Sequence, residues 1–222
     1  MFHGCNKLED IDLSWMNTQS VTTMDHLFMN CQNLKTVNLT GFNFKQVTNI
    51  TGMFEKCTSL ESIEIKDIND APVLTTGTYL FQGCTNLTDV TFASTTDFDK
   101  LTSLTYWFQG CTSLKTIDLS MLTLTAAANF SYMFQGCTQL EEVDLSCIKS
   151  SANIDIRYMF QNCLNLKKLD IRNWQINKVS TQSNYLEMFT NVPNDCEIIV
   201  KDNNCVTWIK SRKSAFTNVH VA

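Results

Sequence analysis

One phrase of 14 residues recurs along this chain at a nearly constant interval. "MFQGCTQLEEVDLS" begins at Met133, and "WFQGCTSLKTIDLS" begins 26 residues earlier, at Trp107. A period between about 20 and 50 residues is typical of repeat architectures, so we predict an elongated stack of small units that share one core. The seven copies follow one another at steps of 26 or 27 residues and begin at Met1, Leu27, Met53, Leu80, Trp107, Met133 and Met159, and a degenerate eighth opens at Met188.

Each copy combines two hydrophobic periods. Within "LEDIDLS", Ile11 and Leu13 alternate with polar residues, which predicts a short strand with both apolar side chains on one face. The other period is helical, with apolar residues at i, i+3, i+4 and i+7, as in Met24, Leu27, Phe28 and Cys31. We therefore predict an α/β solenoid of leucine-rich-repeat type, with short parallel strands on one face, short helices on the other and about eight coils.

The repeat pattern decays after Met188, and this divides the chain into two predicted parts. Residues 1–188 form a solenoid of seven full repeats, and residues 189–222 form a degenerate last coil and a C-terminal cap. "EIIVKD" predicts a final strand, and "NNCVTWIKSRKSAF" predicts a helix that starts at Asn203 or Asn204 and covers the apolar end of the stack. Because Met1 already occupies a repeat position, we expect an N-terminal cap and any targeting segment to be missing.

The repeat phrase M-F-x-x-C-x-x-L-x-x-[IV]-D-L-S resembles the BspA-like leucine-rich repeats. The element before the next Met-Phe, as in "VTTMDHLF", belongs to the same pattern, and the resemblance covers essentially the whole chain. Repeats of this type occur in surface proteins of anaerobic bacteria, mycoplasma lipoproteins and proteins of some parasitic protozoa. The resemblance implies a bacterial cell-surface or secreted protein that acts in adhesion and protein binding.

Seven of the ten cysteines occupy one column of the repeat. Side chains in such a ladder run parallel and do not face one another, so we predict buried, reduced thiols instead of disulfides. Cys196 and Cys205 are the one pair for which a disulfide stays open, and Cys147 is expected to be an isolated free thiol. The column consists of Cys5, Cys31, Cys57, Cys84, Cys111, Cys137 and Cys163.

The sequence shows no catalytic or metal-binding motif. It has no C-x-x-C pair, only three histidines, no nucleophile elbow and no phosphate-binding glycine loop, so we predict no enzyme, no metal site and no cofactor. The net charge of −5 without a basic run argues against nucleic acid and anionic membranes as partners. No stretch approaches the roughly 20 apolar residues of a transmembrane helix, so no direct membrane insertion is expected.

The residue between the two apolar strand positions points away from the core and is often acidic. This column could form an acidic concave face that binds a basic partner or calcium. Alternatively, it is a solvated sheet face whose Asp belongs to the repeat consensus, and the basic residues interspersed with it favour this interpretation. The candidate binding residues are Asp12, Glu64, Asp118, Asp144 and Asp170, and the interspersed basic residues are Lys35, Lys66, Lys115, Lys167, Lys168 and Arg172.

Three functions are compatible with these observations. The leading hypothesis is a binding module whose exposed sheet engages a protein of a host or of a neighbouring cell surface, with Trp15 and Trp174 as anchors if they are not part of the core. The second is a structural stalk or spacer without a ligand of its own. The third is an intracellular recognition module, which the apparently reduced cysteines keep open.

Overall fold

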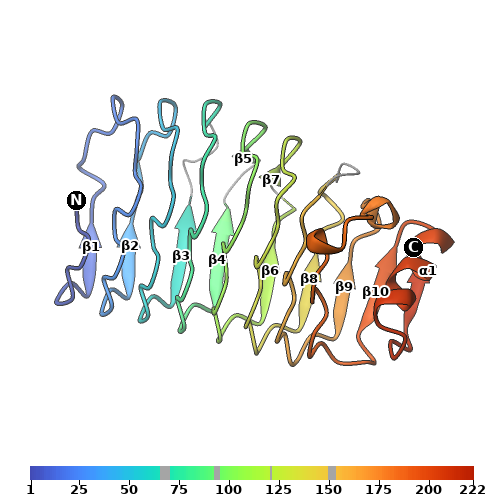
Figure 1. The fold of residues 1–222 in the computed structure, drawn as a ribbon. Coiled ribbons are helices and arrows are strands. Elements are labelled where there is room, and N and C mark those ends of the chain that lie inside the picture. The colour runs from blue at the N-terminus through green and yellow to red at the C-terminus, as the bar shows by residue number, and fades with distance from the viewer. Residues whose placement is uncertain (66–70, 93–95, 121, 150–153) are drawn as a thin grey trace.

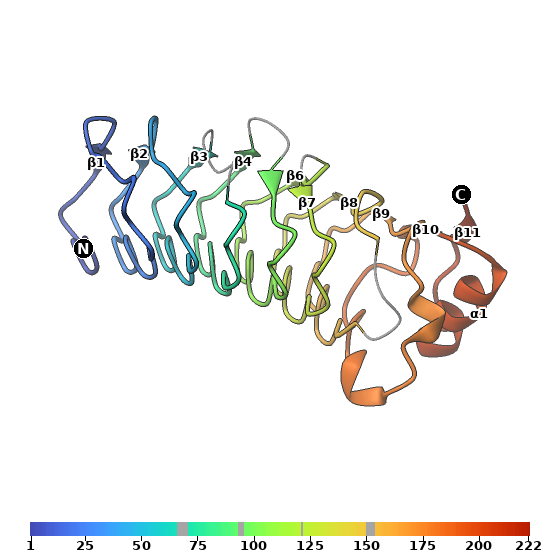
Figure 2. The same cartoon turned by 90° about the horizontal axis from the view of Figure 1, so that it is seen from above.

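The computed structural model describes residues 1–65, 71–92, 96–120, 122–149 and 154–222. Short strands stack side by side along one side of an elongated solenoid (Figures 1 and 2). All of their pairings are parallel, and the two described breaks in this line fall between β2 and β3 and between β4 and β6. The stacked strands are β1 (Asp10–Asp12), β2 (Thr36–Asn38), β3 (Ser62–Ile65), β4 (Asp89–Phe92), β6 (Thr116–Asp118), β8 (Glu142–Asp144), β9 (Lys168–Asp170), β10 (Glu197–Val200) and β11 (Val219–Val221).

The remaining elements are short. Strands β5 (Thr96–Asp97) and β7 (Leu122–Thr123) form a separate parallel pair, and two 3₁₀ helices span Ile176–Lys178 (η1) and Gln182–Asn184 (η2). Helix α1 (Asn203–Arg212) is the only α-helix in the part of the chain that the structure describes. The alternation of apolar and polar residues predicted the strands correctly, because Ile63, Val90 and Ile117 are buried between exposed neighbours.

The short helices that we predicted opposite the strands are replaced by stacked turns. The N–H groups of His26, Phe28 and Asn30 each donate to a carbonyl of the next coil at 2.8 Å, while the N–H groups between them donate to carbonyls three residues back in their own coil. An α-helix would instead direct every N–H to the carbonyl four residues earlier. Backbone hydrogen bonds therefore join neighbouring coils on this side of the solenoid as well as on the strand side.

Left-handed backbone conformations explain why no helix forms there. In most of the stacked turns, two residues four positions apart adopt a positive φ, such as Tyr106 at 63° and Gly110 at 72°. A residue in the left-handed conformation ends an α-helix, and this conformation costs energy for any residue that has a Cβ atom. The apolar spacing i, i+3, i+4, i+7 is shared by one helical face and by two consecutive turns, so the predicted columns are buried although the helix is absent.

The solenoid has about seven turns, so the expected eight coils are not confirmed. The degenerate copy at Met188 leads through a turn into β10, as "EIIVKD" predicted, but the chain then forms α1 and returns as β11, which pairs with β10. Asp202, and not Asn203 or Asn204, is the N-cap of α1, since its carboxylate accepts the N–H of Cys205 at 3.0 Å. The C-terminal segment therefore replaces a coil with a helix and an additional strand.

The core consists of residue columns that continue from coil to coil. The Phe column stacks nearly face to face, with ring centroids 5.5 Å apart between Phe81 and Phe108 and 5.6 Å apart between Phe108 and Phe134. Beside it, the column of thiols donates hydrogen bonds to the Phe carbonyls of the preceding coil, as Cys111 does to Phe81 at 3.2 Å. Each coil thus buries its apolar side chains mainly against its two neighbours.

The thiols are free, and all of the repeat column except Cys5 is buried. Cys196 and Cys205 are also buried and free, so the disulfide that was left open does not form. Burial raises the pKa of Cys57 and Cys137 to about 12, because a thiolate would be poorly solvated there. These thiols carry no appreciable negative charge near neutral pH and are unreactive toward thiol reagents.

We expect thiol titration of the native protein at pH 8 to modify Cys5 rapidly and Cys147 slowly. Both residues are exposed as a whole, but the sulfur atom of Cys147 is partly buried. This burial and the nearby charge of Asp144 raise the pKa of Cys147 to about 11. After denaturation all ten thiols should react, because none is paired. Mass analysis under non-reducing conditions is the control, and the detection of several disulfides would contradict the ladder arrangement.

Candidate functional site

The strand side carries the acidic column that the sequence indicates as a binding surface. The structure aligns Asp118, Asp144 and Asp170 at successive register positions of β6, β8 and β9. The two remaining candidates are separated from this group, because Asp12 is in register with Asn38 and Glu64 is in register with Thr91. The structure thus brings three of the five candidates together, in the C-terminal half of the array.

Most of these side chains hold the turn that follows their own strand. A carboxylate oxygen accepts the N–H two residues later: Asp12 from Ser14 at 2.9 Å, and Asp118 and Asp144 from Ser120 and Ser146 at 2.8 Å each. These hydrogen bonds lower the pKa values of Asp12 and Asp118, because they favour the ionised form. The "DLS" consensus therefore has a local structural role, which is the Asx-turn that follows β1, β6 and β8.

Asp170 differs from the other candidates because it is only 3% exposed. It forms an ion pair with Arg172 and also accepts the Arg172 backbone N–H at 3.1 Å. Burial opposes ionisation, but the hydrogen bonds and charge of Arg172 outweigh it and keep the pKa of Asp170 below its usual range. The expectation that this carboxylate lies on the exposed face is therefore wrong.

Basic residues neutralise part of the acidic surface. Lys35 pairs with Glu9 at 2.8 Å, and Lys167 pairs with Glu141 at 2.6 Å, each across one coil-to-coil step. Lys168 lies in register between Glu142 and Glu197 on neighbouring strands. Lys66 lies outside the described residues. This charge pattern supports a solvated sheet face over most of the array, and the described residues contain no cluster of three His, Cys, Asp or Glu that could hold a metal ion.

The two tryptophans proposed as anchors have opposite environments. Trp174 is fully buried, and its indole N–H donates to the carbonyl of Leu145 at 3.1 Å, so it is part of the core and does not meet the condition for an anchor. Trp15 is 75% exposed in the turn after β1, and its indole N–H donates to the carbonyl of Asp12 at 3.1 Å. Trp15 is therefore an exposed aromatic side chain held at a defined place.

A shallow hollow of about 320 Å³ lies on the strands next to Trp15. It is lined by Asp10, Ile11 and Asp12 of β1 and by Thr36, Val37 and Asn38 of β2; Asp10 and Asp12 are exposed, whereas Ile11 and Val37 are half-buried against the core. We call Asp10, Ile11, Asp12, Trp15, Thr36, Val37 and Asn38 together the N-terminal strand patch. The patch combines an exposed aromatic side chain, carboxylates and a shallow hollow within two coils, which the acidic column alone did not predict.

Sequence reasoning also missed a tyrosine column on the turn side. Tyr79, Tyr106, Tyr132 and Tyr158 stack with ring centroids 4.6 to 4.7 Å apart and are half-buried. Burial raises the pKa of Tyr106, with smaller contributions from the adjacent tyrosines. The signal is visible in the sequence as a Tyr directly before each of four consecutive apolar-Phe pairs. These half-buried tyrosine rings therefore stack from coil to coil at the surface of the turn side, as the phenylalanine rings do in the core.

Comparison with known proteins places the chain in a family. Residues 1–115 and 75–199 both match DUF285, which is described as a Mycoplasma protein of unknown function. The chain belongs to the DUF285 family. No curated protein sequence matches this DUF285 chain significantly. The described part of the chain contains no helix long and apolar enough to cross a membrane.

Solved structures of bacterial leucine-rich-repeat proteins resemble the DUF285 chain. A leucine-rich repeat protein from Eubacterium ventriosum aligns with a TM-score of 0.50 and 20% identity, covering 87% of this chain and 43% of that protein. The leucine-rich repeat protein of T. pallidum aligns with a TM-score of 0.47 and 22% identity over 74% of this chain and 68% of its own. One from Bacteroides ovatus has a TM-score of 0.41 and 18% identity, covering all of this chain and 62% of that protein.

The first of these alignments supports a leucine-rich-repeat solenoid fold. The DUF285 chain spans less than two thirds of the length of the Eubacterium and Bacteroides proteins. At such identities the likeness concerns the fold and not the ligand.

Proposed function

We propose that this chain is a non-catalytic protein-binding module of a cell-surface or secreted bacterial protein, and that its partner docks on the N-terminal strand patch. The observation that carries the proposal is Trp15, which is 75% exposed and held by its hydrogen bond to Asp12. Tryptophan is strongly enriched among the residues that dominate binding energies. An exposed indole held at a defined place beside a shallow hollow is therefore a suitable anchor for a partner.

The charge of the patch indicates the chemistry of the partner. Asp10 and Asp12 are exposed at its rim, and no described basic residue forms an ion pair with either of them. A partner segment with Lys or Arg could place its cation over the indole ring and against these carboxylates. We therefore propose a basic peptide segment as the docking element. The cell-surface location rests on the resemblance of the repeat to BspA-like proteins.

The patch can be tested with peptides selected from a random display library for binding to the protein. We expect enrichment of Lys and Arg, and a loss of affinity of about tenfold or more when Trp15 is replaced by Ala, because truncating a central aromatic contact costs about 2 kcal/mol or more. The matched control is Leu164→Ala, since Leu164 is also exposed, at 51%, but lies in a distant coil. Binding would be measured by fluorescence anisotropy at two salt concentrations.

The outcomes separate the functional alternatives. Selection of no specific peptide, or equal affinity of the Trp15→Ala variant and the parent, would contradict the patch and favour a spacer without a ligand. Protease treatment of intact cells tests the location separately. Release of the chain under these conditions supports surface exposure, and full protection would favour the intracellular module.

A further inference from the structure

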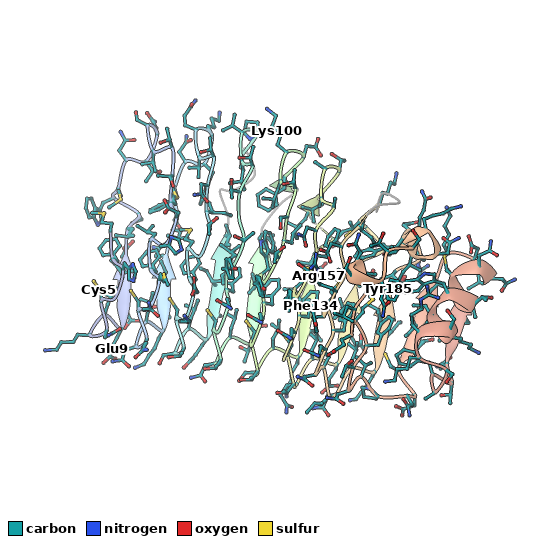
Figure 3. All side chains as sticks on the ribbon, in the orientation of Figure 1. Cys5, Glu9, Lys100, Phe134, Arg157 and Tyr185 are labelled. Atoms are coloured by element: carbon teal, nitrogen blue, oxygen red, sulfur yellow. The ribbon has the colours of Figure 1, made fainter. Side chains whose placement is uncertain are left out.

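A cavity of about 300 Å³ lies between the last stacked turn and the C-terminal end of α1. Its lining includes Tyr185, Glu187, Asn191, Trp208 and Arg212, so two separate segments, within residues 182–191 and 208–213, form it. Figure 3 shows Tyr185 beside the capping helix, and its ring meets the Trp208 ring edge to face at 5.4 Å between centroids. This volume is at the lower end of the range of small-molecule binding pockets.

Two aromatic rings hold Arg212 in this cavity. The guanidinium carbon lies 4.7 Å from the centre of the Tyr185 ring and 4.6 Å from that of Trp208. The two rings are nearly perpendicular to each other and confine the guanidinium, whose planar set of N–H groups matches the two oxygens of a carboxylate. Arg212 donates to the Ser211 hydroxyl, but no carboxylate of the described residues lies within ion-pair distance of it.

A second cation lines the same cavity. The ammonium of Lys213 donates to the carbonyls of Phe189, at 3.4 Å, and Val192, and lies 4.6 Å from the centre of the Phe216 ring. Partial burial lowers the pKa of Lys213, and it too forms no ion pair with a described carboxylate. The lining thus contains two basic side chains, Arg212 and Lys213, and one acidic side chain, Glu187. The cavity is therefore a locally positive site.

The remaining lining residues restrict the kind of anion. Gln182, Thr190 and Asn191 supply hydrogen-bonding groups, and the half-exposed Leu186 and the aromatic rings supply apolar surface. Glu187 is the one acidic residue of the lining, and it accepts a hydrogen bond from Gln161. The Glu187 carboxylate repels a ligand with a single carboxylate less than it repels a doubly charged phosphate. The polar lining suits a ligand that also carries several hydroxyl groups.

We propose that this cavity binds a carboxylate-bearing sugar, such as a uronic acid unit or a sialic acid unit. Its carboxylate pairs with Arg212, its hydroxyls bond to the amide and hydroxyl side chains of the lining, and its ring lies against Tyr185 and Leu186. Basic residues at a helix C-terminus also complement the helix dipole without any ligand. That role requires only charge, whereas recognition of a carboxylate requires the guanidinium geometry, so the two explanations predict different results.

Ligand-observed NMR and calorimetry with glucuronic acid, N-acetylneuraminic acid and glucose test the proposal. We expect at least one of the two acids to bind with a Kd on the order of 1 mM or tighter, and neutral glucose to bind at least about tenfold more weakly. Arg212→Gln should weaken binding of the acid about tenfold or more and remove the preference over glucose. Arg212→Lys should retain only part of the affinity for the acid, because a lysine keeps the positive charge but lacks the planar, two-pronged arrangement of N–H donors.

Two controls separate this site from other effects. Lys210→Gln removes an exposed charge of the same helix outside the cavity lining and should leave binding unchanged, as should Trp15→Ala in the N-terminal strand patch. The thermal midpoints of all variants show whether each one folds. The proposal is overturned if neither acid binds at concentrations on the order of 10 mM, if glucose binds equally well, or if Lys210→Gln and folded Arg212→Lys reduce binding to the same extent.

Discussion

Replacing Phe108 by Ala is expected to destabilise the protein by about 3–5 kcal/mol, the usual cost of truncating a core aromatic residue. Phe108 is fully buried and stacks on Phe81 and Phe134 in the coils on both sides. Its removal leaves a cavity and breaks two ring contacts, each worth about 0.5–1.5 kcal/mol beyond the buried area. Urea denaturation followed by tryptophan fluorescence measures the loss.

Phe2→Ala is the matched control for this prediction. Phe2 occupies the same column but is only partly buried, and it stacks on Phe28 alone, at 5.4 Å. Because each coil is stabilised mainly by its neighbours, the loss at Phe2 should be clearly smaller than the loss at Phe108. Equal losses at the two positions would contradict a solenoid stabilised by nearest-neighbour contacts.

Deleting residues 202–222 is expected to cause aggregation or loss of soluble expression. The deletion removes α1 and β11, and with them the buried side chains of Cys205, Trp208, Ile209, Phe216 and Val219. It would leave β10 as an open strand edge and would uncover Phe189, whose ring meets Phe216 at 5.2 Å. Unpaired edges and exposed apolar ends of a stack favour association between molecules.

Size-exclusion chromatography and thermal melting measure the effect of this deletion, and point variants grade it. Ile209→Asp places a charge at a fully buried position of α1 and should reproduce much of the defect, whereas Lys210→Ala changes an exposed neighbour and should not. A truncated protein that stays monomeric and melts like the parent would show that the segment is not needed to close the stack. The division of the chain at residue 188 stays a prediction.

The repeat period and the residue columns were predictable from the sequence, because identical positions in consecutive coils must pack against one another. The alternation in "DIDL" predicted the parallel strands, and the regular spacing of Phe and Cys predicted the buried ladders. The absence of disulfides in the cysteine column was also predictable, since parallel side chains do not point toward one another. These inferences depend only on the fact that each coil repeats the position of the preceding coil along the axis of the solenoid.

Environments that depend on contacts between distant segments could not be predicted in the same way. Trp15 and Trp174 follow similar strands, yet one is 75% exposed and the other is fully buried. The consensus Asp of the seventh copy, Asp170, is in register with Ile199 of β10 and only 3% exposed, whereas Asp12 and Asp118 at the same repeat position are exposed. The cavity around Arg212 exists only because the capping helix folds back on the turn at Tyr185.

The choice between helices and turns was decided by the tertiary structure for a definite physical reason. The same apolar spacing buries one face of a helix or of two consecutive turns, so periodicity does not distinguish them. Stacking lets alternate N–H groups, such as that of Phe28, bond to the adjacent coil, and these bonds are compatible with a positive φ at residues such as Tyr106. The sequence by itself determined which columns of the repeat are buried, and contact between the coils determined the backbone conformation that buries them.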